Sequence, residues 1–333
     1  MSFPKIILTG SCLLFVGIGL TAIIKKKPEA APEMIQAEEI DVAYVEEAIQ
    51  KEEPALERIE KVSKRSHKLK VQQDNTEDVD DIYRLFTLSS SKYPFVETIR
   101  YTSRAPWLKG RPAWVADYAS YFKTSKHFIA RSLNGKPDYF SQKVKPGDRF
   151  NVFKKDRDIS FHLLCDLSRC KLWFYAIDLD DNARYLMKTY KVGLGRLEDT
   201  SPSGSLTPTG KFLLGDKIAL YKSGVTGYFQ DEEAEMIQVF GTRWMPFGEE
   251  IGETSHPAKG YGIHGSPWVF DEKTESLFED RSKISHYESD GCIRLNREDI
   301  EEIFSIVITK PTVIEVVQDF QEAELPGIET KME

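Results

Sequence analysis

The sequence has little cysteine and no excess of positive charge. Four cysteines in 333 residues are too few and too scattered for a disulfide framework or a four-thiolate zinc site. The formal net charge is −8, so the strongly basic footprint of a nucleic-acid-binding protein is absent. The sequence contains no closely spaced histidine pair of the His-x-x-x-His type, so it offers no metal site of that kind. These absences argue against a disulfide-rich protein, a four-thiolate zinc protein and a nucleic-acid-binding protein. Each cysteine is therefore considered by itself.

Long hydrophobic runs are also scarce, and the one present lies at the N-terminus. Residues 6–24 are uncharged and mostly apolar over 19 residues, which is long enough to cross a bilayer core, and Lys25–Lys27 follow at once. We interpret residues 1–27 as a membrane anchor. A cleaved signal peptide is the alternative because Thr21 and Ala22 are small, but the apolar run continues past them without an A-x-A site.

Residues 28–94 follow with few aromatic residues and blocks of like charge. Between residues 28 and 60 there are 11 acidic residues and two basic ones, and residues 61–70 then contain five basic residues and no acid. Such blocks are typical of a solvated spacer. We predict a charged linker, disordered or partly helical, with a docking site as the alternative.

Globular composition begins near residue 95, and residues 95–157 have a pattern of their own. A helical stretch at residues 114–118 precedes a second short helix, which Thr124 or Ser125 would cap and Asn134–Gly135 would end. A Pro146–Asp148 turn then leads into a strand. This order resembles the second half of a LysM module, a small βααβ unit that binds glycans containing N-acetylglucosamine. A packing subdomain without glycan affinity is the alternative.

From residue 158 the pattern changes to short strands. Alternating apolar residues predict strands at residues 159–165 and 171–177, with a loop at residues 166–169 between them. Further strands are predicted at residues 185–192 and 312–317, with a helix at about residues 297–307. Cys165 and Cys170 flank the first loop and would form either a cross-strand disulfide or a pair of free core thiols. Many short strands with one or two helices predict a mainly β domain, a sandwich or barrel, over residues 158–318, followed by a tail at residues 319–333.

Two motifs carry groups suited to nucleophilic chemistry. The stretch from Ser289 to Leu295 contains Gly291 and Cys292, and the stretch from Tyr261 to Trp268 contains His264. A cysteine attacks as the thiolate, so it needs a base and backbone N–H groups that stabilise the oxyanion. We predict Cys292 as the nucleophile, His264 as the proton acceptor and donor, and the N–H groups of Gly291 and Cys292 as the oxyanion hole.

Four segments in this order resemble the catalytic domain of L,D-transpeptidases: residues 192–193, 207–212, 262–265 and 289–295. The resemblance covers roughly residues 159–318. It implies a β-sandwich-like fold and a cysteine acyltransferase that needs no metal or cofactor. The implied partners are peptidoglycan stem peptides and glycan strands. In the family, the thiolate attacks the third stem residue and releases D-alanine, and an amine then takes the acyl group. Water as acceptor would make the enzyme an L,D-carboxypeptidase, and a lipoprotein amine would make it an anchoring enzyme.

The resemblance extends to the residues around the nucleophile. Arg294 would bind a stem carboxylate, because a planar guanidinium fits one well, and an ion pair with Asp290 or Glu288 is the alternative. Gly265 and Ser266 would orient the His264 ring through a carbonyl or a small polar group and contact substrate. Tyr261 and Trp268 would line the stem-peptide cleft or serve as core aromatics.

Two departures from the family pattern stand out. Asp290 occupies a position where the family often has histidine, and a carboxylate beside Cys292 opposes thiolate formation unless Arg294 or the imidazolium offsets it. Residues 271–281 look inserted and charged, and a lid over the donor site is one interpretation. His286 would either replace the missing histidine as an auxiliary group or simply lie on the insert.

Three functional hypotheses follow from different classes: an L,D-transpeptidase, a catalytically silent wall-binding protein, and a zinc hydrolase using His264, His286 and Cys292. Lys25–Lys27 favour a cytoplasmic body by the positive-inside rule. The substrate implied by the family instead favours a protein anchored in the inner membrane, with its catalytic domain in the periplasm or cell envelope.

Overall fold

The computed structural model describes residues 68–135, 142–220, 222–229 and 232–332. The predicted anchor and most of the predicted linker therefore lie outside the described residues. Within these ranges, the structure contains no helix that is long and apolar enough to cross a bilayer.

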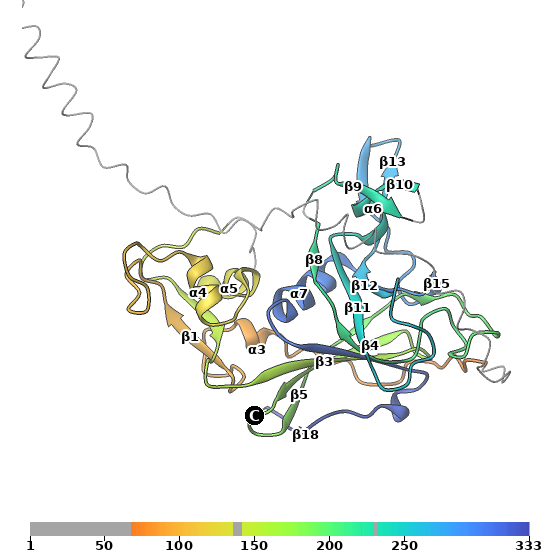
Figure 1. Ribbon diagram of the computed structural model, residues 1–333, viewed down its shortest axis with the longest axis horizontal. Helices are drawn as coiled ribbons and strands as arrows, with labels where there is room; N and C mark the ends of the chain where they lie inside the picture. Colours follow the sequence, from red (N-terminus) through yellow and green to blue (C-terminus); the bar gives the residue numbers. More distant parts are fainter. Residues whose placement is uncertain (1–67, 136–141, 221, 230–231, 333) are drawn as a thin grey trace, which may run out of the picture.

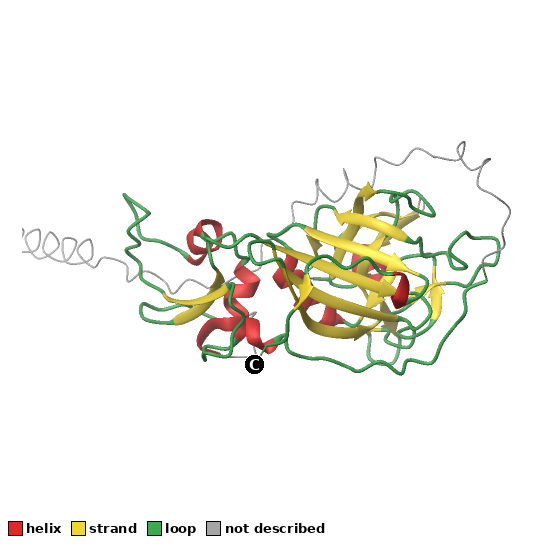
Figure 2. Cartoon of the chain, turned by 90° about the horizontal axis from the view of Figure 1, so that it is seen from below, coloured by secondary structure: helices red, strands yellow, loops and turns green. Residues whose placement is uncertain are grey.

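The class is mainly β, as predicted, and the strands of the large domain form one continuous curled sheet of ten strands (Figure 2). The two layers expected of a sandwich are therefore parts of one sheet, because every neighbouring pair of strands in it is hydrogen-bonded. Three strand pairs are parallel, β12–β16, β17–β3 and β18–β5, and the others are antiparallel. In spatial order the strands are β16 (Ile293–Leu295), β12 (Gly262–Gly265), β11 (Arg243–Ile251), β7 (Gly210–Leu214), β17 (Thr312–Val317), β3 (Ile159–Asp166), β4 (Lys171–Asp178), β5 (Ala183–Lys191) and β18 (Ile328–Glu329), with β8 (Ile218–Ala219) paired to β11.

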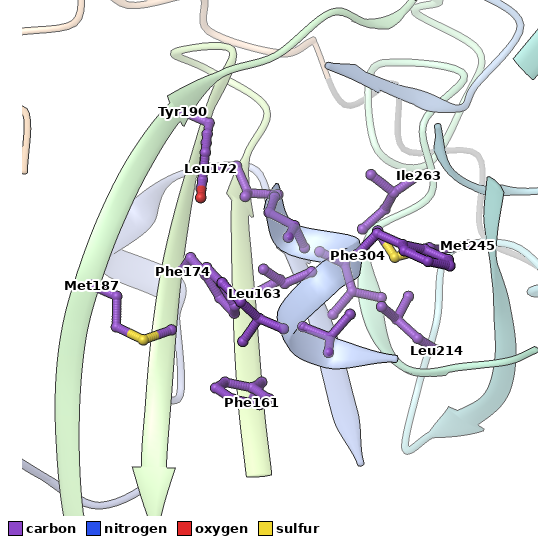
Figure 3. Packing of buried hydrophobic residues seen from close by; sticks show 14 of the residues in the cluster. Phe161, Leu163, Leu172, Phe174, Met187, Tyr190, Leu214, Met245, Ile263 and Phe304 are labelled. Carbon is purple, nitrogen blue, oxygen red and sulfur yellow. The ribbon is translucent and has the colours of Figure 1, made fainter. Parts of the chain in front are cut away.

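Helix α7 (Arg297–Val307) lies inside the curl of this sheet (Figure 1). Ile300, Ile303, Phe304 and Val307 recur at helical spacing and are all buried. Figure 3 shows Phe304 among Leu163, Leu172, Phe174, Leu214, Met245 and Ile263, which come from both halves of the sheet. The predicted helix at residues 297–307 and the predicted strand at residues 312–317 are therefore confirmed, and the helix fills the core between the two ends of the sheet.

The segment before the sheet contains a β-α-α-β unit, with the opening strand that the sequence did not reveal. Strands β1 (Val96–Arg100) and β2 (Arg149–Phe153) pair antiparallel. Helix α4 (Val115–Tyr121) and helix α5 (Lys126–Ser132) lie between them, and the short η2 (Leu133–Gly135) follows. Ser125 caps α5 as predicted, because its Oγ accepts the Phe128 N–H at 2.9 Å. Hereafter this unit, residues 95–157, is called the helical module.

The helical module has an apolar cluster of its own, and it joins the main core through a few residues that include Phe128 and Phe153. The Phe128 and Phe153 rings pack at a tilt of 43°, with 4.6 Å between their centroids, and the Phe153 ring in turn meets that of Phe161 of β3 at 5.9 Å. The His127 ring packs edge-on against Phe304 of α7, and the Ser125 hydroxyl donates to the Ser305 carbonyl. The module is therefore packed onto the large domain, which is what the alternative of a packing subdomain requires.

Residues 68–94 differ from the solvated linker that the sequence predicted. Although this segment is highly charged, Leu69, Ile82, Leu85 and Tyr93 are buried in the main core. Residues Tyr83–Phe86 form helix α3. Residues 68–82, hereafter the strap, run along the edge of the large sheet. The Gln72 and Asp81 N–H groups donate to carbonyls of Ser168 and Met187, and the Thr189 N–H donates to Val79.

The C-terminal residues are likewise packed rather than a free tail. Strand β18 extends the sheet beside β5, and η3 (Phe320–Glu322) precedes it. The Arg184 guanidinium binds carbonyls of Leu325, Pro326 and Gly327. Cys165 and Cys170 are both free thiols and both buried, so the disulfide alternative is not the state of this structure.

Two hairpins and one short helix complete the domain near β12 (Figure 1). The predicted insert at residues 271–281 is largely a hairpin of β13 (Trp268–Asp271) and β14 (Ser276–Glu279). A second hairpin, which the sequence did not predict, pairs β9 (Thr226–Phe229) with β10 (Glu232–Glu235) and leads into α6 (Met236–Phe240). The two-stranded pair β6 (Leu194–Gly195) and β15 (Tyr287–Ser289) lies next to the Cys292 segment.

Candidate active site

The parallel pairing of β12 with β16 brings the two predicted catalytic residues together. His264 is in register with Arg294, and Ile263 is in register with Ile293. Because side chains alternate along a strand, His264, Arg294 and the residue just before β16, Cys292, lie on one face. Ile263 and Ile293 lie on the other face and are fully buried in the core. Cys292 is thus the diagonal neighbour of His264, on the same side of the sheet.

The His264 ring is held in one tautomer. Its Nδ1–H donates to the Gly265 carbonyl at 2.7 Å, which leaves Nε2 free to accept a proton. The predicted orienting carbonyl is therefore that of Gly265. Ser266 plays a different part, because both its N–H and its hydroxyl donate to the Leu295 carbonyl, at 2.7 and 3.1 Å, and hold β12 to β16.

Aromatic side chains shield His264 from water, and the sequence did not single them out for this role. The Phe240 ring of α6 meets His264 edge-on at 5.6 Å, and the Trp244 ring of β11 lies 5.9 Å away. His264 is only 3% exposed. This burial, together with the nearby Arg294 charge, lowers the pKa of His264 to about 3. The imidazole is therefore neutral at physiological pH, with Nε2 unprotonated.

The Cys292 thiol is partly exposed and is not yet directed at His264. Its Sγ lies 3.8 Å from the Gly260 carbonyl, to which the S–H donates. Burial raises the pKa of Cys292 to about 11, and Asp290 acts in the same direction, whereas the Gly262 N–H and Arg294 act against both. Attack by Cys292 thus requires proton transfer to a base at the moment of reaction, because little thiolate exists beforehand.

The turn before Cys292 depends on Gly291. Its φ is +120°, and a Cβ at this position would lie 2.4 Å from the Tyr261 ring and 2.7 Å from the Leu206 carbonyl oxygen. The Gly291 N–H donates to the Ser289 hydroxyl at 3.1 Å, and that hydroxyl donates to the Cys292 carbonyl at 2.7 Å. Of the two predicted oxyanion donors, Gly291 is therefore already engaged, which leaves the Cys292 N–H for that role.

Arg294 is half-buried, and its Nε has no hydrogen-bond partner within the described ranges. The two carboxylates proposed as alternative partners are paired elsewhere: Asp290 with Arg196 at 2.6 Å, and Glu288 with Lys283 at 3.8 Å. The buried environment lowers the pKa of Arg294, although Arg294 remains charged. A guanidinium with an unused buried N–H, beside the candidate nucleophile, is suited to binding an anionic group of a substrate.

The remaining predicted residues lie at different distances from this centre. The Tyr261 ring covers Gly291, and the pKa of Tyr261 is raised by burial and by Cys292. Trp268 begins the β13–β14 hairpin beneath the Arg297 guanidinium, and its Nε1 is buried with no partner in the described part of the chain. His286 is exposed, lies just before β15 and outside the β13–β14 hairpin, and donates through Nδ1 to the Ile284 carbonyl, which fits a structural position.

A zinc site is not supported by the side-chain arrangement. No group of three or more His, Cys, Asp or Glu residues that could hold a metal ion occurs within residues 68–135, 142–220, 222–229 and 232–332. His264 Nδ1 is committed to the Gly265 carbonyl, and His286 Nδ1 to the Ile284 carbonyl.

The Cys-bearing glycine turn, the buried histidine fixed by its neighbour's carbonyl and the flanking arginine all lie in a part of the chain that matches a family model. Residues 160–316 match the YkuD family, the L,D-transpeptidase catalytic domain. This part of the chain is called the YkuD domain below. No match was found in a comparison with curated proteins.

A comparison with solved structures found two bacterial proteins, among others. Bd1075 of Bdellovibrio bacteriovorus is 13% identical over 48% of this chain and 48% of its own, with a TM-score of 0.28. The helical cell shape determining protein Pgp2 of Campylobacter jejuni is 18% identical over 51% of each chain, with a TM-score of 0.31. The match thus spans about half of each of these chains, and a likeness at this level says nothing about activity.

Proposed function

We propose that the protein is a peptidoglycan L,D-transpeptidase that transfers an acyl group from a tetrapeptide stem to an amine, with release of D-alanine. The observation that supports this most directly is the shared face of β12 and β16, which carries Cys292, His264 and Arg294 within the YkuD domain. The proposed partners are stem peptides and glycan strands.

In the proposed reaction, Cys292 carries the acyl group and His264 carries the proton between steps. His264 Nε2 takes the Cys292 proton, and the sulfur attacks the carbonyl carbon of the third stem residue. The oxyanion forms near the Cys292 N–H. The C–N bond to D-alanine then breaks, and the leaving amine takes the proton from His264, which leaves a thioester. An acceptor amine attacks that thioester, gives a proton to His264 and expels the sulfur, which regains its proton.

Arg294 is proposed to bind the carboxylate of the donor stem. A charged guanidinium beside the thiol also stabilises the negative charge that develops on sulfur and oxygen. The β13–β14 hairpin is proposed to border the donor site, because it follows His264 by only a few residues.

Retention at the wall and membrane completes the proposal. The helical module is proposed to contact glycan, and residues 6–24 are proposed to anchor the chain in the inner membrane, with the YkuD domain in the periplasm or cell envelope. The acceptor is an amine in the leading form of the proposal. Water as acceptor would give the L,D-carboxypeptidase on the same stems.

The competing function is that of a silent wall-binding protein. It is favoured by the Cys292 sulfur contact with Gly260 and by the raised pKa of the thiol, both of which describe an unreactive state. An apo geometry with long catalytic contacts is nevertheless common in active enzymes, because these contacts tighten when substrate binds.

Mass spectrometry of a defined disaccharide-tetrapeptide, with and without an added amine acceptor, separates these functions. The transpeptidase releases D-alanine and joins the stem to the amine, and the carboxypeptidase releases D-alanine alone. Cys292→Ala is expected to abolish release while glycan binding survives. Release by Cys292→Ala would refute the mechanism, and absence of release by the unaltered protein would favour the silent function.

A further inference from the structure

We infer that Arg196 is a positioning residue for Cys292: its backbone holds the nucleophile turn, and its side chain neutralises Asp290 so that a carboxylate can occupy this position. The inference rests on the proposed function only in naming Cys292 as the nucleophile.

The backbone of Arg196 is joined to the nucleophile turn on one side and to the following loop on the other. Its N–H donates to the Ser289 carbonyl at 2.9 Å, and its own carbonyl accepts the Leu206 N–H at 2.9 Å. The preceding residue, Gly195, packs directly against the turn, since a Cβ there would lie 2.9 Å from the Gly291 Cα. Arg196 therefore connects the backbone at Leu206 to the residues immediately before Cys292.

The side chain of Arg196 reaches the same turn from outside. Its Nη1 lies 2.6 Å from an Asp290 carboxylate oxygen, and both side chains are more than half exposed. An exposed pair of this kind contributes little to folding. Its importance is local, because Asp290 is two residues from Cys292 and its negative charge opposes ionisation of the thiol. The guanidinium of Arg196 offsets much of the Asp290 charge at the Cys292 thiol.

The other charged groups around the thiol have different partners or different proposed roles. Arg294 also favours the thiolate, lies on the same face of the sheet as His264, and is proposed to bind substrate. His264 is neutral, and Glu288 pairs with Lys283. Charged or ionisable groups near Cys292 include Arg196, Tyr261, His264, Asp280, Lys283, Glu288, Asp290 and Arg294. Among these, Arg196 is the one cation bound to Asp290.

The charge role and a merely structural role predict different patterns in mutants. We would measure the rate of Cys292 alkylation by iodoacetamide in the full chain, from pH 7 to 9.5, by peptide mass spectrometry. Arg196→Ala leaves Asp290 uncompensated and is expected to slow alkylation by roughly threefold at each pH. Asp290→Asn is expected to speed it by a similar factor, and the double variant is expected to return close to the unaltered rate. Arg196→Lys is expected to restore most of the rate, because it keeps the charge.

A matched control is available in the helical module. Arg111 pairs with Asp117 at the same 2.6 Å, although this pair is less exposed, so Arg111→Ala removes an arginine–aspartate ion pair away from Cys292. It is expected to leave the alkylation rate unchanged. The inference is overturned if Arg196→Ala leaves the rate unchanged, or if Arg196→Ala and Asp290→Asn both slow it, because opposite signs are the mark of a charge effect.

The alkylation assay needs no substrate, so its outcome is separate from that of the proposed function. A protein that shows the opposite-sign pattern but never releases D-alanine would keep the role of Arg196 and refute the transpeptidase. A protein that releases D-alanine but shows no opposite-sign pattern would support the transpeptidase and refute the role of Arg196.

Discussion

Gly291 is held at φ +120°, a conformation that residues with a Cβ rarely adopt, and it is tightly enclosed by Tyr261 and Leu206. We expect Gly291→Ala to destabilise the fold by about 1–3 kcal/mol from backbone strain and to abolish D-alanine release, because the Tyr261 ring must move. Urea unfolding and product analysis would measure the two effects.

Gly110→Ala is the matched control for this prediction. Gly110 also has a positive φ, +88°, but no atom lies within 4 Å of the position that its Cβ would take. It should therefore show the strain cost while D-alanine release is retained. Unaltered stability and release in Gly291→Ala would contradict the prediction.

The ionisation of Cys292 and His264 gives a prediction about pH. The pKa of Cys292 is raised to about 11, so the thiolate fraction, and with it the alkylation rate, should rise about tenfold per pH unit from pH 7 towards 10. The pKa of His264 is lowered to about 3, so the imidazole is already neutral above pH 4 and should add no step near pH 6.5. Iodoacetamide alkylation followed at the Cys292 peptide tests both statements.

His264→Gln separates the base from the thiol. It is expected to change the alkylation profile little, because His264 carries no charge in this range, but to lower D-alanine release by about 10²–10⁴-fold. A plateau of alkylation below pH 8 in the unaltered protein would indicate a preformed thiolate–imidazolium pair and contradict this account.

At the scale of elements, the strap is attached to the sheet by a buried lysine. Lys171 of β4 is only 1% exposed, and its Nζ lies 3.0 Å from Asp74 and 2.7 Å from Asp78 of the strap. We expect the double variant Asp74→Asn, Asp78→Asn to lower the free energy of unfolding by about 2–4 kcal/mol, because it leaves a buried ammonium without a counter-charge.

Lys171→Met provides the comparison. It removes the buried charge, keeps the apolar stem and leaves the two aspartates near solvent, so it should cost less than the double variant. Urea unfolding of both, with limited proteolysis of the strap, measures the difference. A larger loss from Lys171→Met would show that packing of the lysine, and not its charge, is what matters.

At the scale of the whole molecule, the helical module packs against the YkuD domain and contributes residues to its core. Phe128 and Phe153 complete the core around Phe161, and Ser125 and His127 contact α7. We expect residues 158–332 expressed alone to be markedly less stable than residues 68–332, with a broader thermal transition, because this apolar surface would be exposed. A truncated domain with an unchanged melting temperature would contradict the shared core.

The sequence alone determined the parts that depend on local pattern. Alternation predicted the strands around Phe161 and Phe174, helical spacing predicted α7, and Ser125 was recognised as a cap, because each depends on neighbours along the chain. Cys292 and His264 were identified in the same way, from motifs of a few residues.

Only the tertiary structure decided which distant residues meet. The parallel pairing of β12 with β16 brings His264 to Cys292, the strap places Asp74 and Asp78 on Lys171, and the pairing of β6 with β15 places Arg196 beside Asp290. The blocks of charge before residue 95 predicted a solvated linker, yet burial of Leu69 and Leu85 overrode that local signal. Such contacts depend on which surfaces the whole chain can bury together, and no window of the sequence contains that information.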